Sequence, residues 1–173
     1  DERPVFGQIF VDNFAEVSQS LSDRKKSNLN NFVTNQLISW ANHNNIYLKR
    51  VSSDRFVAFL DKKILSELEK TKFEIIDRVR ETTAQQNTPL TVSMGFSYAD
   101  DTQEEMDYGA IAKFAQDNLD LALGRGGDQV VVRSKSEETR FYGGKSNPLE
   151  KRTRVRSRMV SQALENLIAE ADQ

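Results

Sequence analysis

Two short strand-like runs separated by only three polar residues constrain the fold of this chain more than any other feature of its sequence. Residues 46–51 (IYLKRV) and 55–60 (RFVAFL) are rich in aliphatic, β-branched and aromatic side chains. Ser52, Ser53 and Asp54 between them suit a tight turn. Parallel strands need a crossover of a dozen or more residues, so these two runs are predicted to form an antiparallel hairpin.

The remainder of residues 5–133 alternates between strand and helix patterns. Further strands are expected at residues 5–12, 90–98 and 129–133. Amphipathic helices are expected from residue 27 to about 42–45, from 64 to about 86, and over 108–122, where Gly124, Gly126 and Gly127 follow. This order predicts an α/β chain of the α+β type, with helices on a mixed or antiparallel sheet rather than a doubly wound Rossmann unit. No glycine fingerprint follows the first strand, so a dinucleotide site is not expected.

Composition limits the chemistry that the chain can perform. There is no Cys and a single His, His43, so thiolate catalysis, Cys-ligated zinc and His clusters are excluded. Any catalysis must use carboxylates, hydroxyls, Lys or Arg. No run approaches the length of a membrane span, and the first residues lack the pattern of a signal peptide, so we expect a soluble segment.

The last part of the sequence differs from the rest. Residues 133–158 are strongly basic, which favours an interdomain segment or a solvated helix face over nucleic-acid binding. Asn147, Pro148 and Glu150 stand in the order that begins a helix, and the apolar stripe that follows requires a covering surface, either a following domain or a second copy. We therefore divide the chain into a domain at 1–135 and a basic linker and helix at 136–173.

Two carboxylates are the best candidates for a functional site. Asp12 ends the first strand and Asp54 lies in the hairpin turn, so neighbouring strand ends could bring both to one Mg²⁺-nucleotide. The alternative is that both simply stabilise turns. Arg55 could bind a nucleotide phosphate or could neutralise Asp12 or Asp54, and the sequence leaves these two roles open.

At this point the motifs resemble a known family. VDNF, the SSDRF turn, TVSMGF and QVVV over residues 5–133 are similar to the GGDEF domains of diguanylate cyclases. The resemblance implies a central sheet of about five strands with flanking helices. Active members hold two Mg²⁺ ions on acidic residues at positions that here fall on Phe10 and Arg55. A phenyl ring offers no oxygen ligand and a guanidinium repels a cation, so we expect no cyclic-di-GMP synthesis.

Other positions depart from the family pattern in the same direction. The turn glycines of the family are replaced by Ser52 and Ser53, and its phosphate-binding Lys is replaced by Ala15. Its guanine-reading Asn and Asp are replaced by Ser18 and Ser27. The Arg-x-x-Asp motif of product inhibition is replaced by residues 43–46. Feedback binding of cyclic-di-GMP is therefore not expected either.

The SSDRF turn together with FYGGKSNPLEKRTRVR (residues 141–156) resembles the middle portion of bacterial, membrane-anchored cyclic-di-AMP phosphodiesterases. Those proteins run from transmembrane helices through a PAS sensor and a degenerate GGDEF domain to a DHH/DHHA1 catalytic domain. The resemblance implies a regulatory module on the cytoplasmic side of the cell membrane, with the PAS and DHH/DHHA1 domains of the same chain as partners and a homodimer in the full protein. Mn²⁺ is expected only in the DHH domain, whose motifs do not occur in this chain.

The resemblance also implies ATP binding with Mg²⁺ and weak ATP hydrolysis, without identifying a catalytic residue. The metal candidates are Asp12 and Asp54, and the nucleotide-binding candidates are Asp12, Asn13, Ser52, Ser53, Asp54 and Arg55. The alternative is a purely structural coupling and dimerisation domain with an empty site. No nucleic-acid partner is expected.

Overall fold

The computed structural model describes residues 1–100 and 107–144. Its elements, in chain order, are β1 (Pro4–Val11), α1 (Phe14–Gln19), α2 (Asp23–His43), β2 (Tyr47–Ser52), β3 (Arg55–Asp61), α3 (Lys62–Lys70), α4 (Glu74–Gln85), β4 (Val92–Tyr98), α5 (Tyr108–Gly124), β5 (Gln129–Val132) and β6 (Arg140–Gly143). The helix expected after Asn147 lies outside the described residues. No helix among the described residues is long and apolar enough to span a bilayer.

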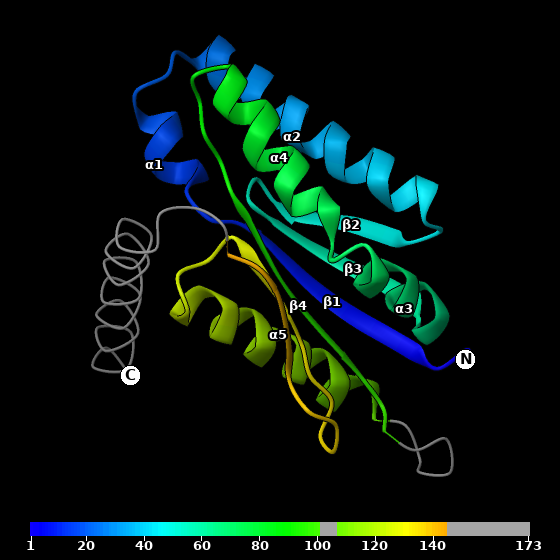
Figure 1. The fold of residues 1–173 in the computed structure, drawn as a ribbon. Coiled ribbons are helices and arrows are strands. Elements are labelled where there is room, and N and C mark those ends of the chain that lie inside the picture. The colour runs from blue at the N-terminus through cyan, green and yellow to red at the C-terminus, as the bar shows by residue number, and fades with distance from the viewer. Residues whose placement is uncertain (101–106, 145–173) are drawn as a thin grey trace, which may run out of the picture.

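The strands form one mixed sheet in the order β2-β3-β1-β4-β5-β6 (Figure 1). All neighbouring strands are antiparallel except β4 and β5, which run parallel. The predicted hairpin is confirmed as β2 and β3, and the predicted α+β sheet is confirmed with it. A sixth strand, β6, was not expected. It belongs to residues that the sequence analysis placed in the linker at 136–173, so the folded domain continues past residue 135.

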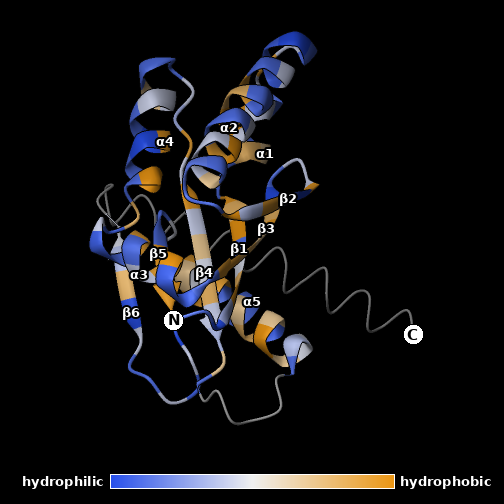
Figure 2. Cartoon of the chain, turned by 90° about the vertical axis from the view of Figure 1, so that its right-hand side faces the viewer, coloured by the Kyte–Doolittle hydropathy of each residue, from blue (hydrophilic) through white to orange (hydrophobic). Residues whose placement is uncertain are grey.

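Helices cover the two faces of the sheet separately (Figures 1 and 2). Apolar side chains of α2, α3 and α4 join alternate residues of the strands in one buried cluster. Helix α5 packs on the other face, against β1, β4 and β5. All seven residues of β4 are buried, because this central strand is covered on both faces.

Gly95 permits the close packing of α5 on β4. A Cβ at this position would lie 2.2 Å from the backbone nitrogen of Leu119 and 2.4 Å from the carbonyl oxygen of Ala115. Both atoms belong to the backbone of α5, which cannot move away locally. The glycine of the TVSMGF strand is therefore required by helix-on-strand contact.

The single helix expected from residue 64 to about 86 is wrong, because the structure divides it into α3 and α4. Lys72 and Phe73 between them have left-handed backbone conformations, with φ of 55° and 51°. The turn places the Phe73 ring in the core, where it is fully buried and lies 5.3 Å from the ring centroid of Phe96. Burial of Phe73 therefore offsets a backbone conformation that is unfavourable for a residue with a side chain.

Candidate nucleotide-binding site

A pocket of about 600 Å³ lies between α1, the first turns of α2 and the hairpin turn. Small-molecule sites commonly have volumes of about 300–1,000 Å³. Its walls combine amides, hydroxyls and charged groups with a similar amount of apolar surface, and the lining residues are Phe14, Ala15, Ser18, Gln19, Lys26, Ser27, Asn30, Asn31, Arg50, Ser53 and Asp54. We call this space the α1–α2 pocket.

Local hydrogen bonds fix the walls of the α1–α2 pocket. The side chain of Ser22 caps α2 by accepting a hydrogen bond from the backbone of Lys25 at 3.3 Å. Further along α2, the side-chain amide of Asn30 donates to the carbonyl oxygen of Ser53 at 3.0 Å and so joins α2 to the hairpin turn. The Arg50 guanidinium donates to the carbonyl oxygen of Ser52 at 3.0 Å.

The charges of the lining favour an anionic ligand. Lys26, which is half-buried, and Arg50 are its basic residues, and Asp54 is its acidic residue. Neither Lys26 nor Arg50 forms an ion pair with any carboxylate in residues 1–100 and 107–144. Both side chains can therefore accept a phosphate group as partner without breaking an existing ion pair.

Asp12 is buried and is not among the residues that line the α1–α2 pocket. One carboxyl oxygen, Oδ2, accepts hydrogen bonds from the Thr91 hydroxyl at 2.5 Å and from the Asp128 backbone at 3.0 Å. Burial raises the pKa of Asp12, although these two hydrogen bonds act to lower it. The other oxygen, Oδ1, has no hydrogen-bond partner in the part of the chain that the structure describes. Asp12 therefore joins the end of β1 to β4 and to the turn before β5.

The remaining candidate residues of this region have separate roles. Asn13 is buried, and its amide donates to the carbonyl oxygen of Pro89 at 2.9 Å. Asp54 accepts a hydrogen bond from the Ser52 hydroxyl at 3.1 Å, while its backbone carbonyl accepts one from Val11 at 2.9 Å. The backbones near Asp12 and Asp54 are thus adjacent, as predicted, and the two carboxylates have separate hydrogen-bond partners.

The positions that the family uses for metal ions do not fit Mg²⁺ in this chain. Phe10 and Arg55 are direct cross-strand partners in β1 and β3. The Arg55 guanidinium lies over the Phe10 ring, 5.5 Å from its centroid, and donates to the Gln116 side chain on α5 at 3.3 Å. Arg55 forms no ion pair with Asp12 or Asp54, so its expected neutralising role is not observed. The described residues contain no group of three or more acidic or histidine side chains that could hold a metal ion.

The structure brings together a different set of residues from the one predicted. Of the six candidates, Ser53 and Asp54 line the α1–α2 pocket, whereas Ser52 and Arg55 are their neighbours in the chain. The three positions that the resemblance matched to phosphate and base contacts, Ala15, Ser18 and Ser27, also line it together. Five polar lining residues were not predicted: Gln19, Lys26, Asn30, Asn31 and Arg50. Lys26, Asn30 and Asn31 are near Ser27 on α2, and Gln19 follows Ser18 on α1, so their proximity in the sequence to these positions was the available signal.

Comparison with known protein families assigns most of this chain to one family. The family described as "Cyclic-di-AMP phosphodiesterase GdpP-like, GGDEF domain" matches residues 9–140. The chain is 54% identical over 171 residues to the cyclic-di-AMP phosphodiesterase PdeA of Listeria monocytogenes, covering 99% of this chain and 25% of that protein. It is 46% identical, with the same coverage, to the cyclic-di-AMP phosphodiesterase GdpP of Bacillus subtilis. The chain thus spans about a quarter of the length of these relatives.

Solved structures with a similar fold include nucleotide cyclases. A bacterial light-regulated adenylyl cyclase superposes with a TM-score of 0.68 at 11% identity, covering 90% of this chain and 57% of that one. The GGDEF domain of DgcB from Caulobacter crescentus, in complex with c-di-GMP, gives a TM-score of 0.61 at 15% identity, covering 76% and 78%. At these identities the likeness concerns the fold alone.

Proposed function

Because this chain belongs to the family of GdpP-like cyclic-di-AMP phosphodiesterase GGDEF domains, we propose that it is a non-cyclising regulatory domain that binds a purine nucleotide in the α1–α2 pocket. One observation carries the proposal. The residues that the resemblance matches to phosphate- and base-contacting positions, Ala15, Ser18 and Ser27, line one pocket of suitable volume together with Lys26 and Arg50, which form no ion pair within residues 1–100 and 107–144. We propose that this pocket takes the nucleotide although the positions that the resemblance matches to metal ligands are Phe10 and Arg55.

ATP is the nucleotide that we propose for this pocket. Serine hydroxyls both donate and accept hydrogen bonds, so Ser18 and Ser27 do not restrict the base to guanine as an Asp would. An Asn amide matches the N6 and N7 edge of adenine, and the exposed side chain of Asn31 lines the pocket. We propose that any ATP hydrolysis here is weak, because Phe10 and Arg55 stand at the two positions that the resemblance matches to catalytic metal ligands.

The role in the longer protein is also a proposal. The relatives are about four times as long as this chain, as the coverage of 25% implies. We propose that the domain couples a PAS sensor to a DHH/DHHA1 cyclic-di-AMP hydrolase with its own Mn²⁺ site. In this proposal the parent protein is a homodimer with these domains on the cytoplasmic side of the cell membrane.

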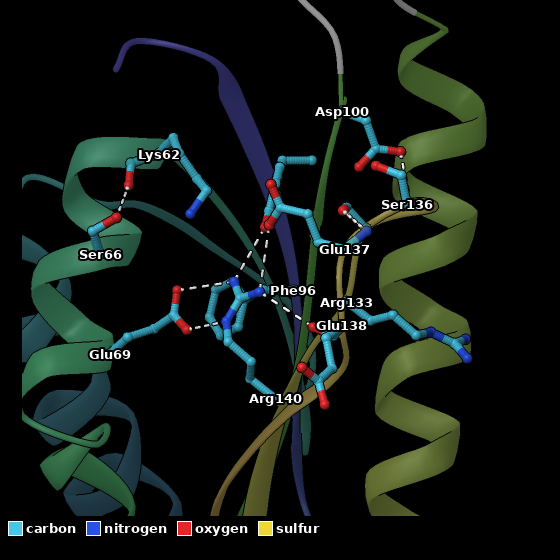
Figure 3. A network of polar contacts seen from close by, with 12 residues as sticks. Lys62, Ser66, Glu69, Phe96, Asp100, Arg133, Ser136, Glu137, Glu138 and Arg140 are labelled. Atoms are coloured by element: carbon cyan, nitrogen blue, oxygen red, sulfur yellow. Dashed lines mark hydrogen bonds and ion pairs between the residues drawn. The ribbon is translucent and has the colours of Figure 1, made fainter.

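A second candidate function is mechanical coupling with no nucleotide bound. This function is favoured by a polar network that connects β6, the last described strand, to α3 (Figure 3). The Arg140 guanidinium pairs with the Glu69 carboxylate at 2.5 Å and donates to the Tyr98 hydroxyl at 3.1 Å. The Tyr142 hydroxyl also donates to Glu69. Burial and this bond raise the pKa of Tyr142 to about 12, so the hydroxyl keeps its proton.

Calorimetric titration with ATP and with GTP distinguishes the two candidates. Ser27→Trp fills the α1–α2 pocket from an exposed position on α2, and Asn28→Trp adds the same side chain at the next residue, which does not line the pocket. We expect ATP to bind the unaltered chain and Asn28→Trp but not Ser27→Trp. Absence of heat with both nucleotides in the unaltered chain would leave mechanical coupling as the function.

A further inference from the structure

We infer that the α1–α2 pocket holds the phosphates of its nucleotide without a divalent metal ion, on the side chains of Lys26 and Arg50. This inference rests on the proposed function and adds the manner in which the ligand is bound. In a metal-dependent site the ion screens the phosphate charge and orients its oxygens. Here protein cations provide the screening, and the metal takes no part.

The first support comes from the residues where a metal would bind. Mg²⁺ requires near-octahedral oxygen coordination, usually from one or two carboxylates together with phosphate and water. Across the β1–β3 pairing, Phe10 provides a ring and Arg55 a positive charge. Asp12, two residues after Phe10, is 6% exposed and already accepts two hydrogen bonds, from Thr91 and Asp128. Turning Asp12 toward a nucleotide would break both of these hydrogen bonds. Asp54 beside Arg55 is the single carboxylate of the pocket lining.

The second support comes from the cations of the pocket. Lys26 is half-buried in the wall, where its charge is screened by water less than that of a fully exposed side chain. It is the fourth residue of α2, a helix of 21 residues whose positive dipole end lies at this side. Arg50 is held by its bond to Ser52 and keeps other guanidinium N–H groups for a phosphate.

A consequence follows for the effect of Mg²⁺. In solution Mg²⁺ binds ATP and neutralises part of the charge that Lys26 and Arg50 would contact. Bound without the metal, the nucleotide presents its full charge to both side chains. Excess Mg²⁺ should therefore weaken ATP binding to this pocket, whereas it strengthens binding to a metal-dependent nucleotide site.

The test is calorimetric titration of the chain with ATP in EDTA and again in excess Mg²⁺. We expect binding in EDTA and a Kd several-fold higher with Mg²⁺. Lys26→Gln and Arg50→Gln should each raise the Kd in EDTA about tenfold, as expected when one charge-assisted hydrogen bond is lost. Lys25→Gln and Lys49→Gln remove the same charge from neighbours outside the lining and should leave the Kd within about twofold.

A gain-of-function variant tests the metal positions themselves. Arg55→Glu combined with Phe10→Asp restores oxygen ligands across β1 and β3, and ATP binding should then strengthen with Mg²⁺. If the double variant does not fold, Arg55→Glu alone, which keeps the Phe10 ring, replaces it in the test. Mg²⁺ should then weaken ATP binding to Arg55→Glu less than it weakens ATP binding to the unaltered chain. If neither variant responds differently to Mg²⁺, these residues do not exclude the metal and the inference fails.

The outcomes separate this inference from the proposed function. Binding only in the presence of Mg²⁺ overturns the inference and leaves nucleotide binding intact. Equal affinity in Lys26→Gln, Arg50→Gln and their two controls likewise overturns it. No binding in either buffer removes the proposed function and the inference together.

Discussion

The guanidinium of Arg55 lies 5.5 Å from the centroid of the Phe10 ring, and these two residues face each other across the pairing of β1 and β3. They occupy the two positions at which the resemblance expects metal-binding carboxylates. Both metal ligands are thus replaced, and the replacements stabilise each other through a cation–π contact. The two strands pair along their length within the six-stranded sheet, so both residues are compatible with the fold.

The buried carboxyl of Asp12 should make stability depend on pH. Burial raises its folded-state pKa above the ordinary value of 3.8, so the folded state holds a proton that the unfolded state releases. This contribution is complete below the unfolded pKa and is lost as pH rises through the folded pKa. Asp12→Asn should not lose stability in this way, and its free energy of unfolding should exceed that of the unaltered chain by about 1 kcal/mol at pH 8. Urea unfolding of both proteins between about pH 4 and pH 8 measures this difference.

Asp12→Ala is the matched control, since it also removes the charge but leaves the Thr91 hydroxyl and the Asp128 backbone without an acceptor. It should lower the free energy of unfolding by about 1–3 kcal/mol. Parallel stability–pH curves for the unaltered chain and Asp12→Asn would contradict the assigned pKa direction.

Gly95 should be among the least replaceable residues of the sheet. In Gly95→Ala the new Cβ would meet the α5 backbone at 2.2 Å, so the helix must shift. We expect a loss of about 3 kcal/mol or failure to fold. Gly109→Ala is the control, because its Cβ would meet only the Asp107 side chain at 3.4 Å and alanine favours the helix. Thermal unfolding followed by circular dichroism compares the two, and equal melting temperatures would show that α5 is not fixed on β4.

Gly127 should be sensitive for two separate reasons. Its φ of 71° is unfavourable for other residues, and a Cβ would lie 3.0 Å from the Asp12 carboxylate. Gly144 has a φ of 87° and open space around it, so it reports the backbone effect alone. Gly144→Ala should cost about 1 kcal/mol, and Gly127→Ala about 2 kcal/mol because of the added contact. If urea unfolding shows the same loss of unfolding free energy for both variants, a side chain at position 127 does not clash with the Asp12 carboxylate.

The Glu69–Arg140 pair should stabilise the attachment of β6. Burial acts to raise the pKa of Glu69, but hydrogen bonds from Arg140 and Tyr142 hold it below its ordinary value of 4.5. The stabilisation is therefore present above the unfolded pKa and is lost as pH falls through the folded pKa. Glu69→Gln should lower the free energy of unfolding by about 2 kcal/mol near pH 7, and this difference should shrink below about pH 4.

Glu67→Gln is the control for Glu69→Gln. Glu67 pairs with Lys70 on the surface, where the two side chains are 61% and 71% exposed, so its loss should change stability by less than about 0.5 kcal/mol. Denaturant unfolding of both variants at two pH values provides the comparison. The same small effect for both would show that the pair in Figure 3 does not secure β6.

The parts of the fold that were predictable depend on local signals. The hairpin follows from two apolar runs and a three-residue turn, and the end of α5 follows from its glycines. The break at Phe73 was not predictable, because neither left-handed residue is a glycine and the driving force is burial against β4. Strand β6 was missed for a similar reason, since it has four residues and its Arg140 pairs with Glu69, 71 positions earlier.

The candidate site was predictable to the level of its neighbourhood. The hairpin turn and the loop after β1 do lie together, as the adjacent backbones of Val11 and Asp54 confirm. The direction of the Asp12 carboxyl could not be derived, because β1 has a neighbour on each side and either could receive it. The residues of α2 that line the pocket could not be predicted either. Any polar residue of a helix could face a pocket until the packing of that helix on the sheet is known.

The most direct test of this account is a two-dimensional amide NMR titration of the isotope-labelled chain with ATP in EDTA. We predict that the shifted resonances belong to the walls of the α1–α2 pocket, including Ser18, Ser27, Asn30 and Ser53. A second hollow, lined by Trp40, His43, Glu67 and Arg78 among others, should remain unchanged. No shifts at saturating ATP, or shifts confined to this second hollow, would contradict the account.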